Sequence, residues 1–354
     1  MKDYLIVGLG LSGTSLAFRL EQKGRSFLVF DDQSQEASKV AGGFMNPVIL
    51  KRFTLAWKAD LQLEKAYDFY GKMEDLLKMS FLEPLEIYRR FSSVEEQNNW
   101  FAAADKPTLA PFLDTKLVSH VNEHVPGRYS FGKVLKTSRI DPRGLLEAYE
   151  SHLFQQNLLK EERFEYDALQ IFEDHVEYKG ISAKNVIFCE GFGLQKNPFF
   201  SYLPLRGNKG EYILIKAPGL DLKVGVKSSI FIFPAGEGDI YAVGATYSNH
   251  DKTPQPTEAA REELVTKLKD LIDVDFEVVD QVAGLRPSTI DRRPMAGRHP
   301  EHSRLYCCNG FGSRGILIAP MISEELLNFI EKDEPLPSEV DIQRFTKKWF
   351  SKAS

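Results

Sequence analysis

The segment from Tyr4 to Asp32 restricts the fold more than any other part of the chain. A short apolar run leads into GLGLSG (residues 8–13), and a helical pattern follows it. A second apolar run, residues 26–30, then ends at the acidic pair formed by Asp31 and its neighbour. Strand, glycine turn, helix, strand and acid stand in the order of a βαβ unit that binds a dinucleotide.

Each part of this segment has a physical role in such a unit. Gly8 permits the tight turn, Gly10 lets the backbone approach a pyrophosphate, and Gly13 lets the helix pack closely on the strand. The helix N-terminus supplies free N–H groups and the positive end of a dipole for the phosphates. Asp31 follows at about the expected 20 residues and can accept hydrogen bonds from a ribose diol. An ordinary glycine-rich loop is the alternative, and the complete order of elements favours the dinucleotide site.

Composition limits the remaining classes of protein. The chain has 354 residues, more than a single typical core, so we expect two closely joined domains. A hydrophobic fraction of 43% and a charged fraction of 27% are typical of a soluble globular protein. No run of about 18 apolar residues predicts a membrane span. The net charge of −5 gives no overall attraction to nucleic acid.

The cysteines also bear on the class of protein. Cys189, Cys307 and Cys308 are too few for a disulfide framework. Two of them are adjacent and lack the CxxC spacing of a metal or redox pair. We therefore expect buried free thiols, a cytoplasmic protein and no bound metal.

Two further glycine-rich elements distinguish between possible dinucleotides. One is AGGFMNP, residues 41–47, directly after the second strand. The other is GFGSRG, residues 310–315, where a strand leads through a glycine turn into a helix. A nicotinamide enzyme needs only the first fingerprint, whereas a flavin needs backbone donors at its far end to hold the anion of the reduced ring. A structural turn at residues 310–315 remains the alternative.

At these motifs the chain resembles the FAD-dependent D-amino-acid oxidase superfamily, and within it the glycine oxidases and the C-terminal oxidase domain of a bifunctional tRNA modification enzyme. The likeness to glycine oxidases is sharpest in AGLRPSTIDRRPMAGRHP, residues 283–300. The likeness to the tRNA enzyme is sharpest in residues 310–315 with Ala319-Pro320, and in LPLRG, residues 203–207. The resemblance extends from Tyr4 to about Pro337, with a middle part that matches only in pattern.

The resemblance implies FAD as the cofactor and assigns roles to particular residues. The residues expected to bind FAD are Gly8, Gly10, Leu11, Ser12, Gly13, Asp31, Asp32, Ala41, Gly42, Gly43, Met45, Gly191, Gly312, Ser313, Arg314, Gly315 and Ile316. Some relatives attach FAD through a cysteine upstream of a segment like His299–Ser303. Alignment on that segment puts Gly284 at the cysteine's place, so we expect FAD to be bound non-covalently.

On the substrate side the resemblance points first to Arg286. Its position is where members of the family that act on amino acids place an arginine for the substrate carboxylate, and a planar guanidinium fits a carboxylate bidentately. A buried structural ion pair is the alternative for Arg286. We expect Tyr247 and Met45 beside it, with Arg206 and Arg52 as the next candidates for the carboxylate anchor.

The implied reaction is oxidation of a C–N bond by hydride transfer to the flavin, followed by hydrolysis of the imine, with O2 as the electron acceptor. The cofactor carries the difficult step, and the protein positions the donor carbon. Two substrates remain open: a small amino acid or N-alkyl amino acid, which is preferred, and a carboxymethylamino group on a tRNA base. A flavin-binding protein without turnover is the alternative from another class. The oligomeric state stays open.

The sequence predicts an α/β protein in which a Rossmann-like FAD-binding domain is interleaved with a smaller α+β domain on a mixed or antiparallel sheet. Dinucleotide signals recur at both ends of the chain while hairpin signals fill the middle. The expected FAD-binding domain comprises residues 1–50, 138–205 and 280–335, the expected substrate domain comprises residues 51–137 and 206–279, and the tail 336–354 packs on the FAD-binding domain. Long helices are expected at residues 55–79 and 258–272, and a hairpin turn at 235–239.

Overall fold

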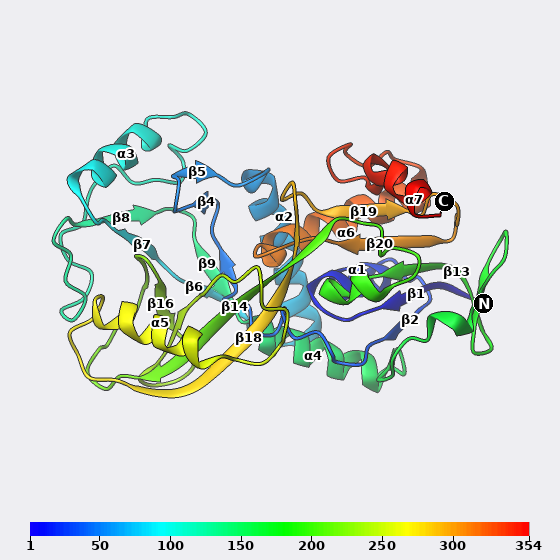
Figure 1. Ribbon diagram of the computed structural model, residues 1–354, viewed down its shortest axis with the longest axis horizontal. Coiled ribbons are helices and arrows are strands. Elements are labelled where there is room, and N and C mark those ends of the chain that lie inside the picture. The colour runs from blue at the N-terminus through cyan, green and yellow to red at the C-terminus, as the bar shows by residue number, and fades with distance from the viewer. Residues whose placement is uncertain (354) are drawn as a thin grey trace.

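The structure is a computed structural model that describes residues 1–353. Two lobes lie side by side, and both termini belong to the lobe at the right of Figure 1. That lobe is built on a sheet of eight strands and the other on a sheet of seven. Within the described residues, no helix is both long and apolar enough to cross a membrane.

The βαβ unit expected at the N-terminus is present. Strand β1 (Lys2–Val7) leads into helix α1 (Leu11–Gln22), and β2 (Phe27–Phe30) returns parallel to β1. Gly8 has φ of +98°, which favours glycine, and a Cβ at Gly13 would lie 1.8 Å from the Gly8 carbonyl oxygen. The helix can start this close to the strand only because Gly13 has no side chain.

The eight-stranded sheet joins parts of the chain that are far apart in sequence. Its parallel core places β13 (Ile181–Phe188) between β1 and β20 (Leu305–Asn309), and β10 (Leu159–Lys160) extends it parallel to β2. Three antiparallel strands complete it: β11 (Leu169–Ile171), β12 (Val176–Tyr178) and β19 (Met295–Arg298).

Both faces of this sheet are covered, as a mostly parallel sheet requires. Tyr4 and Ile6 belong to a hydrophobic cluster on the face covered by helices, whereas Leu5 and Val7 belong to a separate cluster on the opposite face. Alternate residues of β1 therefore serve opposite layers. The helices that contribute to the first cluster are α1, α2 (Ala59–Leu77), α4 (Pro142–Gln155) and α6 (Gly315–Lys332), together with α3 (Val94–Ala104) through Trp100.

The C-terminal segment contacts the opposite face of the same sheet. It contains a 3-10 helix η3 (Ile342–Phe345) and helix α7 (Thr346–Ala353). Asp341 pairs with Ala296 in β19, and the Trp349 ring lies 5.4 Å from the Tyr202 ring. Residues 341–349 are thus held against the eight-stranded sheet.

The seven-stranded sheet has the order β18, β14, β17, β16, β15, β7, β8, and among its neighbouring strands β15 and β7 alone run parallel. It is therefore mixed, as expected, and the expected turn at 235–239 joins β16 to β17. Strands β14 and β18 run together from the left-hand lobe toward the centre of Figure 1. The bounds are β7 (Ile87–Arg90), β8 (Phe131–Val134), β14 (Leu205–Lys216), β15 (Gly225–Lys227), β16 (Phe231–Pro234), β17 (Ile240–Gly244) and β18 (Glu277–Thr289).

The remaining elements are short or cover the second sheet. Helix α5 (Glu258–Lys269) packs Leu264 and Leu268 into the core of that sheet, and α3 (Val94–Ala104) begins at Ser93, whose side chain accepts from the Glu96 N–H. Two small sheets and two 3-10 helices complete the chain: β3 (Phe44–Met45), β6 (Leu82–Pro84) and β9 (Ser138–Ile140); β4 (Val48–Ile49) and β5 (Thr54–Leu55); η1 (Tyr166–Ala168) and η2 (Gly191–Lys196).

The α/β fold class with its mixed second sheet is confirmed. The expected domain boundary at residue 280 falls inside strand β18. This strand stays paired with β14 along its length, as far as Thr289 opposite Leu205. Residues 280–289 therefore extend the second sheet, since backbone pairing with β14 holds them there. The other expected boundaries stay predictions.

Candidate functional site

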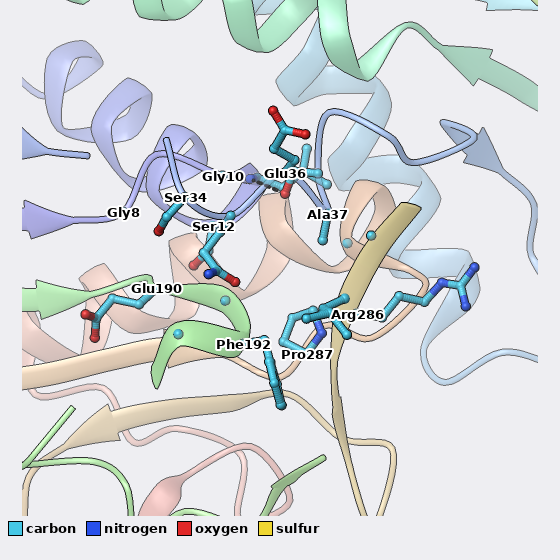
Figure 2. A pocket seen from close by; sticks show the side chains of 18 of the residues that line it. Gly8, Gly10, Ser12, Ser34, Glu36, Ala37, Glu190, Phe192, Arg286 and Pro287 are labelled. Atoms are coloured by element: carbon cyan, nitrogen blue, oxygen red, sulfur yellow. Dashed lines mark hydrogen bonds between the residues drawn. The ribbon is translucent and has the colours of Figure 1, made fainter. Parts of the chain in front are cut away.

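A cavity of about 960 Å³ is lined by residues from both lobes. This volume is near the upper end of the range for small-molecule and cofactor sites, about 300–1,000 Å³. Figure 2 shows part of the lining, with Gly8, Gly10 and Ser12 near one end and Arg286 and Pro287 near the other. The expected cofactor residues that line it are Gly8, Gly10, Leu11, Ser12, Asp31, Asp32, Ala41, Gly42, Gly43, Gly191, Gly312, Ser313, Gly315 and Ile316.

The N-terminus of α1 opens onto this cavity. Gly10 is its N-cap and has no side chain of its own with which to cap the helix. The Leu11 N–H donates to the Ser38 hydroxyl at 3.1 Å, while the Ser12 hydroxyl donates to the Cys308 carbonyl at 2.7 Å. A Cβ at Gly10 would lie 2.9 Å from the Ser38 oxygen, so glycine here lets the Ser38 side chain approach the backbone closely. Helical N–H groups and the helix dipole suit a pyrophosphate at this point.

Asp31 stands at the carboxyl end of β2, where a ribose would meet it. Its carboxylate already accepts hydrogen bonds from the Leu9 N–H and from the Gln33 N–H, the latter at 2.7 Å. Burial raises the pKa of Asp31 in spite of these two bonds. A carboxylate has about four acceptor sites, so two backbone donors leave room for a diol.

Glu190 is a cavity residue that the sequence reasoning missed. It follows β13, and its carboxyl group accepts from the Tyr166 hydroxyl and from the Asn197 amide at 2.7 Å. Burial raises the pKa of Glu190 to about 7, so near neutral pH the group is close to half protonated. The sequence signal that could have identified Glu190 was its position, directly after an apolar strand and directly before the glycines at 191 and 193.

The far end of the cavity is built from the two additional glycine elements. The Gly312 N–H donates to the Pro287 carbonyl at 3.0 Å, so the loop before α6 is tied to β18. Gly312 has φ of +56°, and a Cβ at Gly43 would lie 1.9 Å from the Ile140 carbonyl oxygen. Both segments therefore depend on glycine to bring backbone to the cavity wall.

Three expected cofactor residues lie behind the lining. Gly13 serves the contact between α1 and β1, and Met45 is fully buried. The guanidinium of Arg314 donates to the Asn46 carbonyl, and burial lowers the pKa of Arg314 to about 10. Arg314 thus joins the loop before α6 to the segment after Gly43 without facing the cavity.

Arg286 lines the cavity from strand β18. Its Nη1 donates to the Asn208 side-chain oxygen at 2.9 Å and to the Thr246 carbonyl at 3.4 Å. Asn208 stands directly opposite Arg286 in the register of β14 and β18, and the guanidinium lies over Gly210. No acidic side chain of residues 1–353 forms a salt bridge with Arg286, which argues against the structural ion pair.

Tyr212 is a second cavity residue that was missed. A Cβ at Gly42 would lie 3.1 Å from the Tyr212 hydroxyl, and the ring lies against Gly244. Burial raises the pKa of Tyr212, while Arg286 and Arg139 act in the opposite direction. The sequence signal that could have identified Tyr212 was the alternation along β14. Tyr212 stands two residues after Gly210, and residues two apart share one face of a strand.

The other residues proposed for the substrate side lie apart from Arg286, and Arg206 and Arg52, the alternative anchors, stay proposals. Tyr247 and Arg206 line a separate cavity, and Arg52 is exposed in a turn closed by its N–H to the Ile49 carbonyl. Thr246 is buried and its carbonyl faces Arg286, so the next side chain points to the other side of this extended segment. Tyr247 is 66% exposed.

Comparisons with known proteins agree with this architecture. The glycine oxidase of Bacillus licheniformis is 24% identical over 93% of this chain and 92% of its own length. The tRNA 5-methylaminomethyl-2-thiouridine biosynthesis bifunctional protein MnmC of Marinobacter nauticus is 21% identical over 92% of this chain, which spans only 55% of that relative. The crystal structure of glycine oxidase from Geobacillus kaustophilus superposes with a TM-score of 0.80 at 18% identity, covering 97% of each chain.

One family model accounts for most of the chain. It is described as FAD dependent oxidoreductase and matches residues 3–328, from β1 into α6. That range includes the glycine turn before α1, the segment after β2 and the loop before α6, which together line the large cavity. The chain belongs to the FAD-dependent oxidoreductase family.

Proposed function

We propose that this protein oxidises the C–N bond of an amino acid or an N-alkyl amino acid. The observation that carries the proposal is Arg286, a cavity-lining guanidinium whose hydrogen bonds go to an amide oxygen and a carbonyl rather than to a carboxylate. Only Nη1 is used in these bonds, so Nη2 and Nε remain to receive a substrate carboxylate as a fork. A carboxylate held in this way would fix the orientation of the carbon next to the amine.

The cavity fits FAD along its length. The N-terminus of α1 would hold the pyrophosphate, Asp31 the ribose, and the backbone of residues 41–43 and 312–316 the ring. FAD bound there supplies a two-electron acceptor. The substrate loses a hydride and a proton and becomes an imine, water hydrolyses the imine, and O2 takes the two electrons to give H2O2.

This chain's own residues bind and orient. Arg286 would fix the carboxylate, Asn208 holds the guanidinium, and the N–H groups at the start of α6 would stabilise negative charge on the bound flavin. The tRNA alternative uses the same bond and the same anchor, because a carboxymethylamino group also carries a carboxylate next to its reacting carbon. The two alternatives differ in the size of the molecule that must reach Arg286.

The relatives named glycine oxidase support a small carboxylate-bearing amine. The test mixes the flavin-loaded protein anaerobically with a panel of amino acids, N-alkyl amino acids and simple amines. Reduction of the bound flavin is monitored by the loss of its visible absorbance. We expect amines with a carboxylate to reduce the flavin and matched amines without one to fail. If no amine bleaches the flavin, the protein binds flavin without this turnover and the proposal is wrong.

Arg286 is tested with the substrate that the panel identifies. Loss of a charge-assisted pair in a partly dry site costs about 2–5 kcal/mol, so Arg286→Ala should raise the KM strongly. Arg286→Lys keeps the charge and loses the fork, and it should fall between the wild type and Arg286→Ala. Both variants should keep the flavin spectrum. Reduction of Arg286→Ala as readily as wild type would place the carboxylate anchor elsewhere.

A further inference from the structure

A second cavity, of about 520 Å³, adjoins the large one. Gln195 and Lys252 line both cavities, so the two are neighbours across these side chains. Its walls come from η2, the start of β14, the segment after β17 and the end of β18. The lining residues are Gln195, Leu205, Arg206, Gly207, Tyr247, Asn249, Lys252, Ser288, Thr289, Ile290 and Arg292.

The charge of this lining is its most unusual property. It holds three cations, Arg206, Lys252 and Arg292, and no acidic residue, although the whole chain has a net charge of −5. The Lys252 ammonium donates to two backbone carbonyls, those of Gly207 and Asn249. None of the three cations forms a salt bridge with a carboxylate in the described part of the chain. The cavity therefore carries positive charge that no acidic side chain offsets, as an anion site requires.

The remaining lining adds surface for a flat, partly apolar group. Tyr247 is 66% exposed and Ile290 is 55% exposed, and both border the cavity. An exposed tyrosine ring beside cations is the arrangement on which a nucleic-acid base stacks while its phosphate is neutralised. Ser288 adds a hydroxyl beside Gly312. A Cβ added at Gly312 would lie 3.5 Å from the serine oxygen. A lone carboxylate would fill only a small part of this volume.

We propose that the second cavity binds a nucleotide phosphate, with the phosphate on Arg206, Lys252 and Arg292 and the base against Tyr247. The nucleotide is either free or one unit of an RNA strand, because both present the same phosphate and base. Two arginines suit this chemistry, since the guanidinium fork matches phosphate oxygens in pairs. The site lies outside the glycine turn and Asp31 that serve the cofactor, and it does not depend on amine oxidation.

The test uses the flavin-loaded protein, so that the large cavity is already filled. A short single-stranded RNA labelled with fluorescein is titrated by fluorescence anisotropy, and unlabelled uridine monophosphate serves as a competitor. Arg206→Gln and Arg292→Gln should each weaken RNA or mononucleotide binding about ten-fold. For RNA, each should also reduce the slope of log affinity against log salt by about 0.7. Tyr247→Ala should weaken binding about ten-fold, while Tyr247→Phe, which keeps the ring, should bind as the wild type does.

A matched control is Arg143→Gln, which removes an exposed arginine of α4 that lies outside the cavity lining. It should leave the affinity unchanged, and so should Arg286→Ala, which separates this site from the proposed substrate anchor. Tighter binding of RNA than of the mononucleotide would identify a strand as the source, and binding of the mononucleotide alone would identify a free nucleotide.

Three results would overturn the proposal. The first is no binding of either probe to the flavin-loaded protein. The second is an equal loss of affinity in Arg292→Gln and Arg143→Gln, which would indicate unspecific attraction. The third is a probe that binds only to flavin-free protein and is displaced by free FAD. That result would show that the probe occupies the cofactor cavity. Each variant should first show an unchanged flavin spectrum and melting temperature.

Discussion

The guanidinium of Arg286 lies directly against Gly210, on the neighbouring strand. A Cβ at Gly210 would be 1.8 Å from Nη2, a distance that no packing tolerates. Gly210 stands opposite Gly284 in the register of β14 and β18, so the absence of a side chain at position 210 makes the space into which Arg286 reaches. The position of the proposed carboxylate anchor therefore depends on the glycine at position 210.

Gly210→Ala should move the guanidinium without removing its charge. Misplacement of a positioning group by about 1 Å can cost a factor of 100, so kcat/KM for a carboxylate-bearing amine should fall about 10- to 100-fold. The flavin spectrum should be unchanged. Gly71→Ala is the matched control, because a Cβ at Gly71 on α2 meets no atom within 4 Å and alanine favours the helix. Wild-type kinetics in Gly210→Ala would show that the anchor is not at this place.

Acid precipitation should release the flavin into the supernatant. Cys189 lines the cavity, but it is buried, and burial raises its pKa well above the usual value. Its thiol therefore stays protonated and is a poor nucleophile toward the flavin. Cys307 and Cys308 are buried outside the lining. Absorbance spectra of pellet and supernatant after precipitation decide the matter, and yellow colour retained by the pellet would contradict non-covalent binding.

Tyr70→Phe should destabilise the fold through helix α6. The Tyr70 hydroxyl donates to the Ile316 carbonyl at 2.8 Å, and that carbonyl lacks its usual helical partner because position 320 is a proline. Loss of a hydrogen-bond donor to a buried carbonyl costs about 1–3 kcal/mol of unfolding free energy. Denaturant unfolding measures this loss.

A double-mutant cycle with Pro320→Ala tests the cause. The second change returns a backbone N–H to the Ile316 carbonyl, so Tyr70→Phe should cost less in that background than in the wild type. An equal cost in both backgrounds would mean that the tyrosine stabilises α2 and α6 by packing alone.

Unfolding free energy should fall as the pH drops from about 6.5 to about 4. His299 is buried, its Nδ1 accepts from the Glu301 and His302 N–H groups, and burial lowers its pKa to about 4. In this interval the unfolded chain binds a proton that the folded chain does not, so acid favours unfolding. The contribution should be about 3 kcal/mol.

The pH effect is measured as a difference between proteins. His299→Gln cannot titrate, so its stability should change less than that of the wild type across this interval. His250→Gln, at an exposed position, should follow the wild type. Parallel pH profiles for wild type and His299→Gln would contradict the assignment.

The sequence alone predicted the segments that are proposed to bind the cofactor. The strand, glycine turn, helix and acid from Tyr4 to Asp31 follow from local rules, because backbone conformation and close helix packing restrict which residues can stand at Gly8 and Gly13. The segments around Gly43 and Gly312 were also recognisable, and both line the cavity. Local chemistry was sufficient for these parts.

The tertiary structure decided which side chains line the proposed substrate end of the cavity together. Arg286 and Asn208 are 78 positions apart and meet only through the register of β14 and β18. A shift of one residue in that register would turn each side chain to the opposite face, and no local pattern specifies the register. For the same reason Tyr247 and Arg206 could be named as candidates from the sequence, while their place in a separate cavity followed only from the packed strands.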